Sequence, residues 1–301
     1  NWGMETYAIC AHLSRRHADQ MRIIGVCHAD EQVYYDLLSR YEPVIHRFIA
    51  VSDECAARLR ELCRHRQGDT VVRPCAVHVP RELQRSYSRP GEPIRLLYAS
   101  RIEQRQKRVY DLLALAQTLD QRGVPFQLTI AGGGPNAAEL RARVQRLPQA
   151  LRARIDLKGI LAPAKSPGLL LSHDIALLTS AYEGTAVFML EAMAHGCVPV
   201  VTRVSGTSAA IEEGQTGQSV PVGDISAMAQ AIAGLSADRE RLGQMGRAAH
   251  LSAQRFSHEE YADWLVQLHR DIWREAPRAW PARRRLFPLN YSIYRWGLAP
   301  F

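Results

Sequence analysis

Residues 180–196 read SAYEGTAVFMLEAMAHG, and the buried-looking run VPVV follows at 198–201. This stretch predicts a loop, a helix over 186–195 and a strand, with Gly196 ending the helix as glycines commonly do. Glu183 lies in the loop and Glu191 lies about two turns inside the helix. Eight positions at about 1.5 Å per residue separate the two carboxylates by roughly 12 Å. The helix N-terminus between them offers free amides and a positive dipole end, which favour a bound anion.

Strands and helices alternate on both sides of this stretch. Apolar runs predict strands over 94–99, 126–131, 155–158, 175–178 and 198–201, and amphipathic spacing predicts helices over 109–122 and 136–149. This alternation indicates a doubly wound domain with a parallel sheet. In such a sheet ligands bind at the carboxyl ends of the strands, where the crossover direction switches.

The first part of the chain shows a similar alternation. We expect strands over 21–27, 46–52 and 70–73, with helices over 4–19, 31–41 and from Ser52 or Asp53 to about 66. Residues 81–93 (RELQRSYSRPGEP) are polar and read as an interdomain linker. The predicted division is an incomplete N-terminal Rossmann-like domain over 1–85, a second Rossmann-like domain over 94–262, and a C-terminal helix and tail over 263–301.

Composition narrows the class of protein. The formal net charge of the 301 residues is +8, which favours anionic partners or a basic proteome equally. No C-x-x-C pair occurs among the six cysteines, so we expect no zinc site and reduced, cytosolic thiols. No apolar run approaches the roughly 20 residues that cross a bilayer. A nucleic-acid partner is not expected, because no recognition motif accompanies the charge.

Further motifs accompany the two glutamates: YASR at 98–101 with QKR at 106–108, IAGGGP at 130–135, LKGI at 157–160, and GQTG at 214–217 with VPVGD at 220–224. With these motifs, the chain from about residue 20 to about residue 265 resembles the retaining glycosyltransferases of family 4, the glycosyl transferases group 1. The resemblance implies the GT-B architecture, in which two Rossmann-like domains face a cleft.

The resemblance also implies a role for each matching residue. Arg101 and Lys107 match the basic pair that grips the donor diphosphate, and Glu183 matches the glutamate near the transferred sugar. Glu191 matches the glutamate that binds the ribose. The loop whose amides meet sugar and phosphate corresponds to Gly184, Thr185, Ala186 and Val187. This chain reads Gly-Thr-Ala where the family commonly has Gly-Phe-Gly, which leaves the identity of the sugar open.

Three more places complete the predicted site. Gly133 and Gly134 match the turn beside the donor, and Gly159 and Ile160 match the place where backbone groups hold the nucleobase. His28 ends a strand of the first domain and matches a histidine that reaches across to the donor sugar, with a structural role as the alternative. The predicted catalytic set is therefore His28, Arg101, Lys107 and Glu183, with no metal.

The resulting hypothesis is a retaining, metal-independent glycosyltransferase. It would move a sugar from a UDP- or GDP-linked donor to a glycan, glycolipid or other hydroxyl acceptor, in cell-envelope polysaccharide or glycoconjugate synthesis. It would need no cofactor and would work in the cytoplasm. A glycogen-synthase-like or sucrose-type transferase is an alternative, and so is a nucleotide-sugar-binding remnant without turnover.

The two ends of the chain raise separate expectations. Family members usually begin with a strand and a glycine-rich loop, so we expect a segment upstream of Asn1, with a divergent short form as the alternative. The basic and aromatic tail over 278–301 has two interpretations. It crosses back to pack on the first domain, or it makes a peripheral contact with an anionic membrane surface, where a lipid-linked acceptor would be met.

Overall fold

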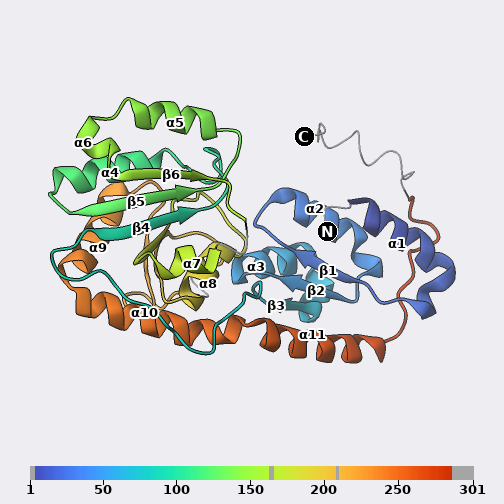
Figure 1. The fold of residues 1–301 in the computed structure, drawn as a ribbon. Coiled ribbons are helices and arrows are strands. Elements are labelled where there is room, and N and C mark those ends of the chain that lie inside the picture. Colours follow the sequence, from blue (N-terminus) through green and yellow to red (C-terminus); the bar gives the residue numbers. More distant parts are fainter. Residues whose placement is uncertain (1–3, 163–165, 208–209, 287–301) are drawn as a thin grey trace. The chain divides into compact units, whose positions relative to one another are not determined.

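The computed structural model describes residues 4–162, 166–207 and 210–286, which form two compact units (Figure 1). Unit 1 comprises residues 1–74 and 262–301, and unit 2 comprises residues 75–261. Both are α/β units in which the strands of the sheet run parallel. No described helix is long and apolar enough to span a bilayer.

Unit 1 is built on a three-stranded sheet in the order β1-β2-β3. The strands are β1 (Ile24–Cys27), β2 (Arg47–Ala50) and β3 (Thr70–Val72), and the helices are α1 (Met4–His17), α2 (Gln32–Tyr41), α3 (Asp53–Leu62) and α11 (His258–Trp273). Apolar side chains of α11 pack against Ile49 on one face of the sheet. On the other face, Gly25 lets Leu38 of α2 approach the backbone closely. These elements confirm the predicted alternation, with shorter strands than expected.

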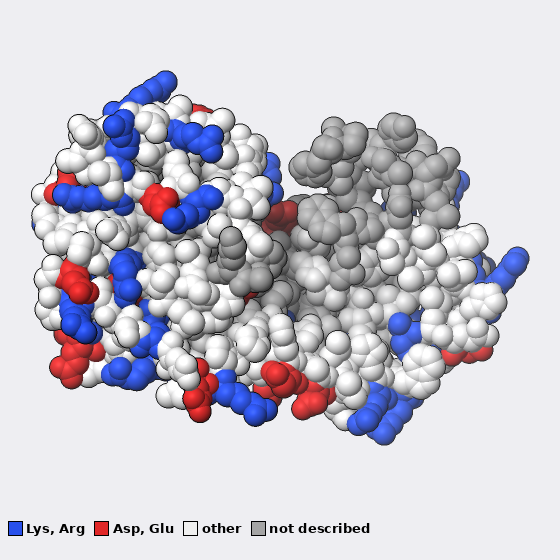
Figure 2. Space-filling view, viewed as in Figure 1, with Lys and Arg blue, Asp and Glu red and all other residues white. Residues whose placement is uncertain are grey.

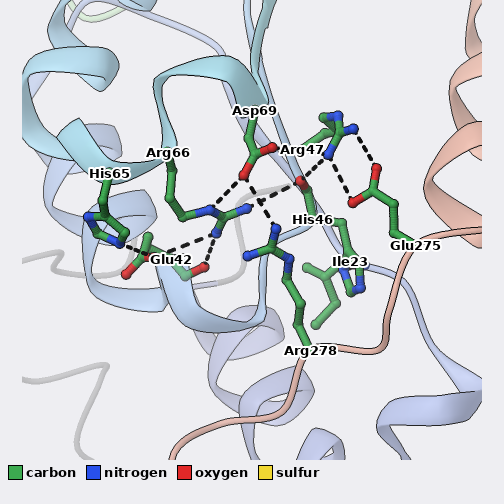
Figure 3. Close-up of polar contacts among 9 residues, drawn as sticks. All are labelled: Ile23, Glu42, His46, Arg47, His65, Arg66, Asp69, Glu275 and Arg278. Atoms are coloured by element: carbon green, nitrogen blue, oxygen red, sulfur yellow. Dashed lines mark hydrogen bonds and ion pairs between the residues drawn. The ribbon is translucent and has the colours of Figure 1, made fainter.

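Charged side chains join the two chain segments of unit 1 (Figure 3). The buried Arg66, whose side chain is 4% exposed, donates to Asp69 Oδ2 at 2.8 Å. Arg47 also reaches Asp69, at 3.2 Å, and pairs with Glu275 beyond α11. Further along, Trp280 is buried, and its backbone amide donates to Ser14 Oγ at 2.9 Å. The tail is therefore anchored within unit 1 at Trp280, residues 281–285 are exposed, and 287–301 lie outside the described residues.

Unit 2 contains a six-stranded parallel sheet in the order β6-β5-β4-β7-β8-β9. The chain enters at the central β4 (Ile94–Ala99) and moves outward through β5 (Phe126–Ala131) to β6 (Ile155–Gly159). It then crosses back to β7 (Ile175–Leu178), which pairs with β4, and continues through β8 (Val198–Thr202) to β9 (Gln218–Val220). The direction of winding therefore switches between β4 and β7, as the sequence predicts for a doubly wound sheet.

Helices cover both faces of this sheet. Leu96 and Tyr98 of β4 point into a core shared with α4 (Asp111–Gln121) and α9 (Ile225–Ala237). Leu97 points the other way, toward α7 (Ser166–Leu171) and α8 (Val187–Ala194). The alternation follows from the period of two along a strand. The remaining helices of the unit are α5 (Ala137–Gln145), α6 (Gln149–Arg152) and α10 (Arg239–Ala253).

The elements of unit 2 differ from the sequence prediction in several places, and the edge strand β9 was not predicted. The helix expected over 136–149 ends at Gln145, and Pro148 is the N-cap of the separate α6, because proline has no amide to donate inside a helix. The short α7 was not predicted at all. Its sequence SPGLLL carries a proline and a glycine, which disfavour a helix on propensity.

Candidate functional site

The candidate residues of unit 2 gather at the carboxyl edge of its sheet. Arg101 follows β4, Gly132 follows β5, Ile160 follows β6 and Glu183 follows β7, and parallel strands end at one edge. A pocket of about 350 Å³ opens there. The residues that line it are Ala99, Ser100, Arg101, Ala131, Gly132, Gly133, Ile160, Leu161, Ala162, Ser166, Leu169 and Glu191.

The glycine-rich turn after β5 shapes one wall of this pocket. Gly132 has a φ of +138°, and a Cβ on it would lie 1.9 Å from the carbonyl oxygen of Ser100. Its amide donates to the Gly159 carbonyl at 2.8 Å, while the Gly133 carbonyl accepts from the Ile102 amide. Only glycine permits this close packing of the ends of β4, β5 and β6. A Cβ on Gly134 would lie 2.4 Å from the Ile102 carbonyl oxygen, which extends the same contact.

The predicted nucleobase position lies at the same wall. Gly159 ends β6 in the left-handed region with a φ of +67°. The side chain of Ile160 is 84% exposed and packs over Gly133, where a Cβ would meet it at 2.6 Å. An exposed branched side chain beside a pocket offers an apolar surface to a planar ligand.

Lys107 and Glu183 form an ion pair beside the switch point. Lys107 Nζ lies 2.5 Å from Glu183 Oε1, and the Ser180 hydroxyl donates to the same oxygen at 2.6 Å. Glu183 is 6% exposed, so the pair is largely buried. The sequence predicts both members of the pair as site residues, but it does not predict their pairing or the part played by Ser180.

Hydrogen bonds to backbone carbonyls hold together the segments that carry this pair. The Thr179 hydroxyl donates to the Lys107 carbonyl at 2.7 Å, and the Ala181 amide donates to the Gln106 carbonyl at 2.7 Å. The Thr202 hydroxyl donates to the Ser180 carbonyl at 2.6 Å from the neighbouring strand. The loop before α8 is thus fixed against the loop after β4, which keeps Glu183 near Lys107.

Arg101 is placed differently from Lys107. Its side chain is 54% exposed and lines the pocket. It donates to the amide oxygen of Gln106 at 2.7 Å and lies 4.0 Å from the Glu103 carboxylate. Gln106 in turn donates to the Tyr182 carbonyl at 3.2 Å. Arg101 is therefore held at the open side of the site by Gln106, a residue of the QKR motif to which the sequence prediction gave no role.

Glu191 is the carboxylate that lines the pocket from α8. Among the described residues, its side chain has no hydrogen-bond or ion-pair partner. Burial raises the pKa of Glu191 above its ordinary value. A partly buried carboxylate without a partner is costly, and hydroxyl donors from a ligand would satisfy it.

The loop from Gly184 to Val187 leads into α8. No side chain caps this helix at Ala186, and Val187 is exposed at the first turn. Gly206 packs so closely that a Cβ on it would lie 1.9 Å from the Gly184 carbonyl oxygen. On its other side, the Thr185 hydroxyl accepts from the Cys75 amide at 3.4 Å. The loop is thus held by two segments that sequence analysis did not connect with it.

His28 belongs to unit 1, where it follows β1 and packs edge-on against Tyr34. Burial lowers its pKa below the ordinary value. Its predicted reach toward the donor sugar stays a prediction. Among the described residues, no group of three or more His, Cys, Asp or Glu side chains is placed to hold a metal ion.

Comparison with known proteins places the site in a family context. Residues 93–238 match the family model of the glycosyl transferases group 1. The chain is 31% identical over 194 residues to an alpha-D-kanosaminyltransferase of Streptomyces kanamyceticus, covering 64% of this chain and 49% of the relative. It is 34% identical over 161 residues to a glycogen synthase of Mycobacterium tuberculosis, covering 52% and 37%. The chain thus spans half or less of these two relatives.

Solved structures resemble this fold across most of the chain. The Anabaena protein Alr3699/HepE, in complex with UDP-glucose, superposes with a TM-score of 0.72 at 18% identity, covering 89% of this chain and 76% of that protein. At such identity the likeness concerns the fold, which has two parallel α/β units in GT-B glycosyltransferases. Residues 93–238 therefore match the family model of the glycosyl transferases group 1, and the two parallel α/β units of the chain have the GT-B fold.

Proposed function

We propose that this protein is a retaining, metal-independent glycosyltransferase that uses a nucleotide-diphosphate sugar as donor. The observation that carries the proposal is the pocket at the switch point. It presents the carboxylate of Glu191, which has no partner within the part of the chain that the structure describes, and the exposed guanidinium of Arg101. A ribose diol would satisfy the carboxylate, and a diphosphate would pair with the guanidinium and with the amides at the start of α8.

The rest of the donor would extend from this pocket toward Glu183. The nucleobase would lie against Ile160 and Gly133, held by backbone groups, so UDP and GDP are both candidates for the leaving group. The transferred sugar would lie near Glu183 and the loop at Gly184. Thr185 stands where the family commonly has phenylalanine, and its contact with Cys75 gives this end of the site its own shape.

Two cations would stabilise the charge that grows on the leaving diphosphate. Arg101 contributes from the open side and Lys107 from beside Glu183. Glu183 is already engaged by Lys107 and Ser180, so it would orient sugar hydroxyls rather than attack the anomeric carbon. Departure and attack would then share one face of the sugar, and the leaving phosphate would take the acceptor proton. Retaining glycosidases, in contrast, place a carboxylate nucleophile about 5 Å from the acid.

The relatives favour a glycan or other hydroxyl acceptor without deciding which one. The similarity to a glycogen synthase makes a storage-polysaccharide transferase the second candidate. We place the activity in the cytoplasm, in cell-envelope polysaccharide or glycoconjugate synthesis. On the face seen in Figure 2, Lys and Arg are dispersed over unit 2 with Asp and Glu among them. Pairs such as Arg154–Asp120 and Lys158–Asp156 contribute to this mixture.

A donor panel tests the proposal. UDP, GDP and their common hexose conjugates are added singly, and the shift of the melting temperature is measured, since a ligand that binds the folded state raises apparent stability. Binding should be weakened strongly by Glu191→Ala, while the exposed Arg146→Ala serves as a control with a comparable loss of side chain. If no nucleoside diphosphate or nucleotide sugar shifts the transition, the proposal is wrong.

Turnover and stereochemistry need separate measurements. With an α-linked donor, the anomeric proton coupling of the product should show an α linkage, and a β linkage would contradict retention. Lys107→Ala should reduce turnover by at least about 100-fold, as loss of one preorganised charge commonly does. Tight donor binding without transfer to any offered acceptor would favour the nucleotide-sugar-binding alternative.

A further inference from the structure

The two helices that wall the nucleotide side of the pocket end in the same way. α7 is followed by His173, whose Nδ1 lies 2.7 Å from the Leu169 carbonyl oxygen. α8 is followed by His195, whose Nδ1 lies 2.8 Å from the Glu191 carbonyl oxygen. A carbonyl only accepts, so each imidazole donates through Nδ1–H. Both accepting residues line the pocket, so each histidine closes the last turn beneath a pocket residue.

One side chain from outside the pocket joins these two helix ends. Arg85 donates through one terminal nitrogen to the His195 carbonyl at 2.9 Å and through the other to the His173 carbonyl. A planar guanidinium can span two acceptors in this way because its donors are arranged as a rigid fork. Each contact also places a positive charge at a helix carboxyl end, where the helix dipole favours it.

The segment around Arg85 is itself fixed to unit 2. The guanidinium lies 4.2 Å from the centre of the Tyr87 ring, and the Tyr87 hydroxyl donates to the Gly196 carbonyl at 2.9 Å. Leu83 packs so closely on Gly196 that a Cβ there would lie 2.8 Å from its methyl group. The Ser88 amide donates to the buried Asp174 at 2.9 Å. Residues 83–88, which we call the strap, therefore form a packed part of unit 2.

We propose that Arg85 is a positioning residue that sets the spacing of α7 and α8, and through it the width of the nucleotide side of the pocket. Arg85 is absent from the pocket lining, so it acts through the backbones that carry Leu169 and Glu191. This inference rests on the proposed function, because the pocket must receive the nucleoside diphosphate part of a donor. It assigns a role in ligand binding to a segment whose polar sequence resembles a plain linker.

Loss of the fork should weaken nucleotide binding more than it harms the chemical step. In Arg85→Ala, two carbonyls lose their shared donor and the helix ends are free to separate. We expect the dissociation constant of the preferred nucleoside diphosphate to rise about tenfold, in line with the loss of one or two hydrogen bonds that hold the helix ends. Because the nucleoside is bound equally in the ground and transition states, KM for the donor should rise while kcat changes little.

The matched control is Arg89→Ala, which removes an exposed arginine at the end of the same segment and changes the charge equally. It should bind nucleotide as the wild type does. Arg85→Lys keeps the charge but replaces the fork by a single ammonium, so it should lose several-fold in affinity. This milder variant carries the test if Arg85→Ala fails to fold, and wild-type affinity in Arg85→Lys would overturn the proposal.

Chemical rescue separates positioning from general destabilisation. Binding of UDP and GDP is measured by titration calorimetry with Arg85→Ala, in millimolar guanidinium chloride and in sodium chloride of equal concentration. Guanidinium should restore nucleotide affinity in Arg85→Ala and in no other variant. A variant that is merely destabilised would instead lose further affinity. A wild-type protein that binds neither nucleotide would overturn the proposed function together with this inference. A wild type that binds, beside an Arg85→Ala variant of equal affinity, would overturn the positioning role alone.

Discussion

A methyl group at Gly206 would test whether the loop before α8 is the place where the donor sugar is held. Gly206 has a φ of +81°, and an added Cβ would lie 1.9 Å from the Gly184 carbonyl oxygen. Contacts of Cβ atoms below 3.0 Å are essentially never observed, so one of the two segments must move by more than 1 Å. The left-handed backbone alone costs an L-residue about 1 kcal/mol. Displacement of the Gly184 carbonyl adds to this and moves the amides that would meet the sugar and phosphate.

Gly123 provides the matched control. It also has a positive φ, +68°, but nothing lies within 4 Å of its added Cβ. We expect Gly123→Ala to lose about 1 kcal/mol of unfolding free energy and to keep full turnover. Gly206→Ala should lose more stability and about 100-fold in kcat/KM for the donor, the usual effect of a 1 Å misplacement. Urea unfolding and a coupled assay for nucleoside diphosphate release measure the two effects. Equal turnover in the two variants would refute the assignment of this loop.

Four further predictions concern charged and titratable groups. Burial raises the pKa of Glu191, and a protonated carboxyl accepts hydrogen bonds from hydroxyl groups poorly. The affinity for the nucleotide sugar should therefore fall on acidification, starting at a pH above the pKa of an ordinary glutamate. In calorimetric titrations, Glu191→Gln should flatten this pH dependence. Lys107→Met should cost about 3 kcal/mol of unfolding free energy by leaving Glu183 buried and unpaired, and adding Glu183→Gln should recover part of it in urea titrations. Burial lowers the pKa of His46 to about 4 in the folded protein, whereas the pKa in the unfolded chain is near 6.5, so the unfolded chain binds the proton more tightly. The free energy of unfolding should therefore fall by up to about 3 kcal/mol as the pH drops from 6.5 to 4. His46→Asn should remove this pH dependence. Arg101→Ala should slow donor association and reduce its salt dependence in stopped-flow measurements more than Lys107→Ala does, because Arg101 is the exposed cation.

The inner strands of unit 2 could be predicted because parallel strands covered on both faces read as continuous apolar runs, whereas the edge strand β9, with the sequence QSV, has no such run and was not predicted. Val198–Thr202 is buried at all five positions, and Ile175–Leu178 at all four. The sequence also marks where these strands end, since glycines or polar residues follow directly. The topological rule for doubly wound sheets then brings Arg101, Lys107 and Glu183 to one edge. This is why the sequence predicts that these residues gather at one edge of the sheet, although it does not predict their contacts.

The contacts themselves depend on pairings that local sequence does not encode. Lys107 and Glu183 are 76 residues apart and meet because the chain crosses back to place β7 beside β4. Arg85 and His195 are 110 residues apart, and so are Cys75 and Thr185. In the polar run over 81–93, only the large apolar side chains of Leu83 and Tyr87 suggest that the segment packs on the protein. The composition of a segment predicts its average exposure, but a few anchored side chains are enough to fix it on a surface.

The two cations of the site differ in a way that bears on mechanism. Lys107 is largely buried and its charge is balanced by Glu183, whereas Arg101 is half-exposed and held through the neutral Gln106. An approaching donor anion would therefore meet the field of Arg101 first, because a buried ion pair has little net field at a distance. On the proposed function, Lys107 would gain importance only as the glycosidic bond breaks. Charge then accumulates on the leaving phosphate, and a cation fixed beforehand by Glu183 and Ser180 stabilises it without reorganisation. On the proposed function, the Lys107–Glu183 pair is thus the means by which a flexible side chain is preorganised for the transition state.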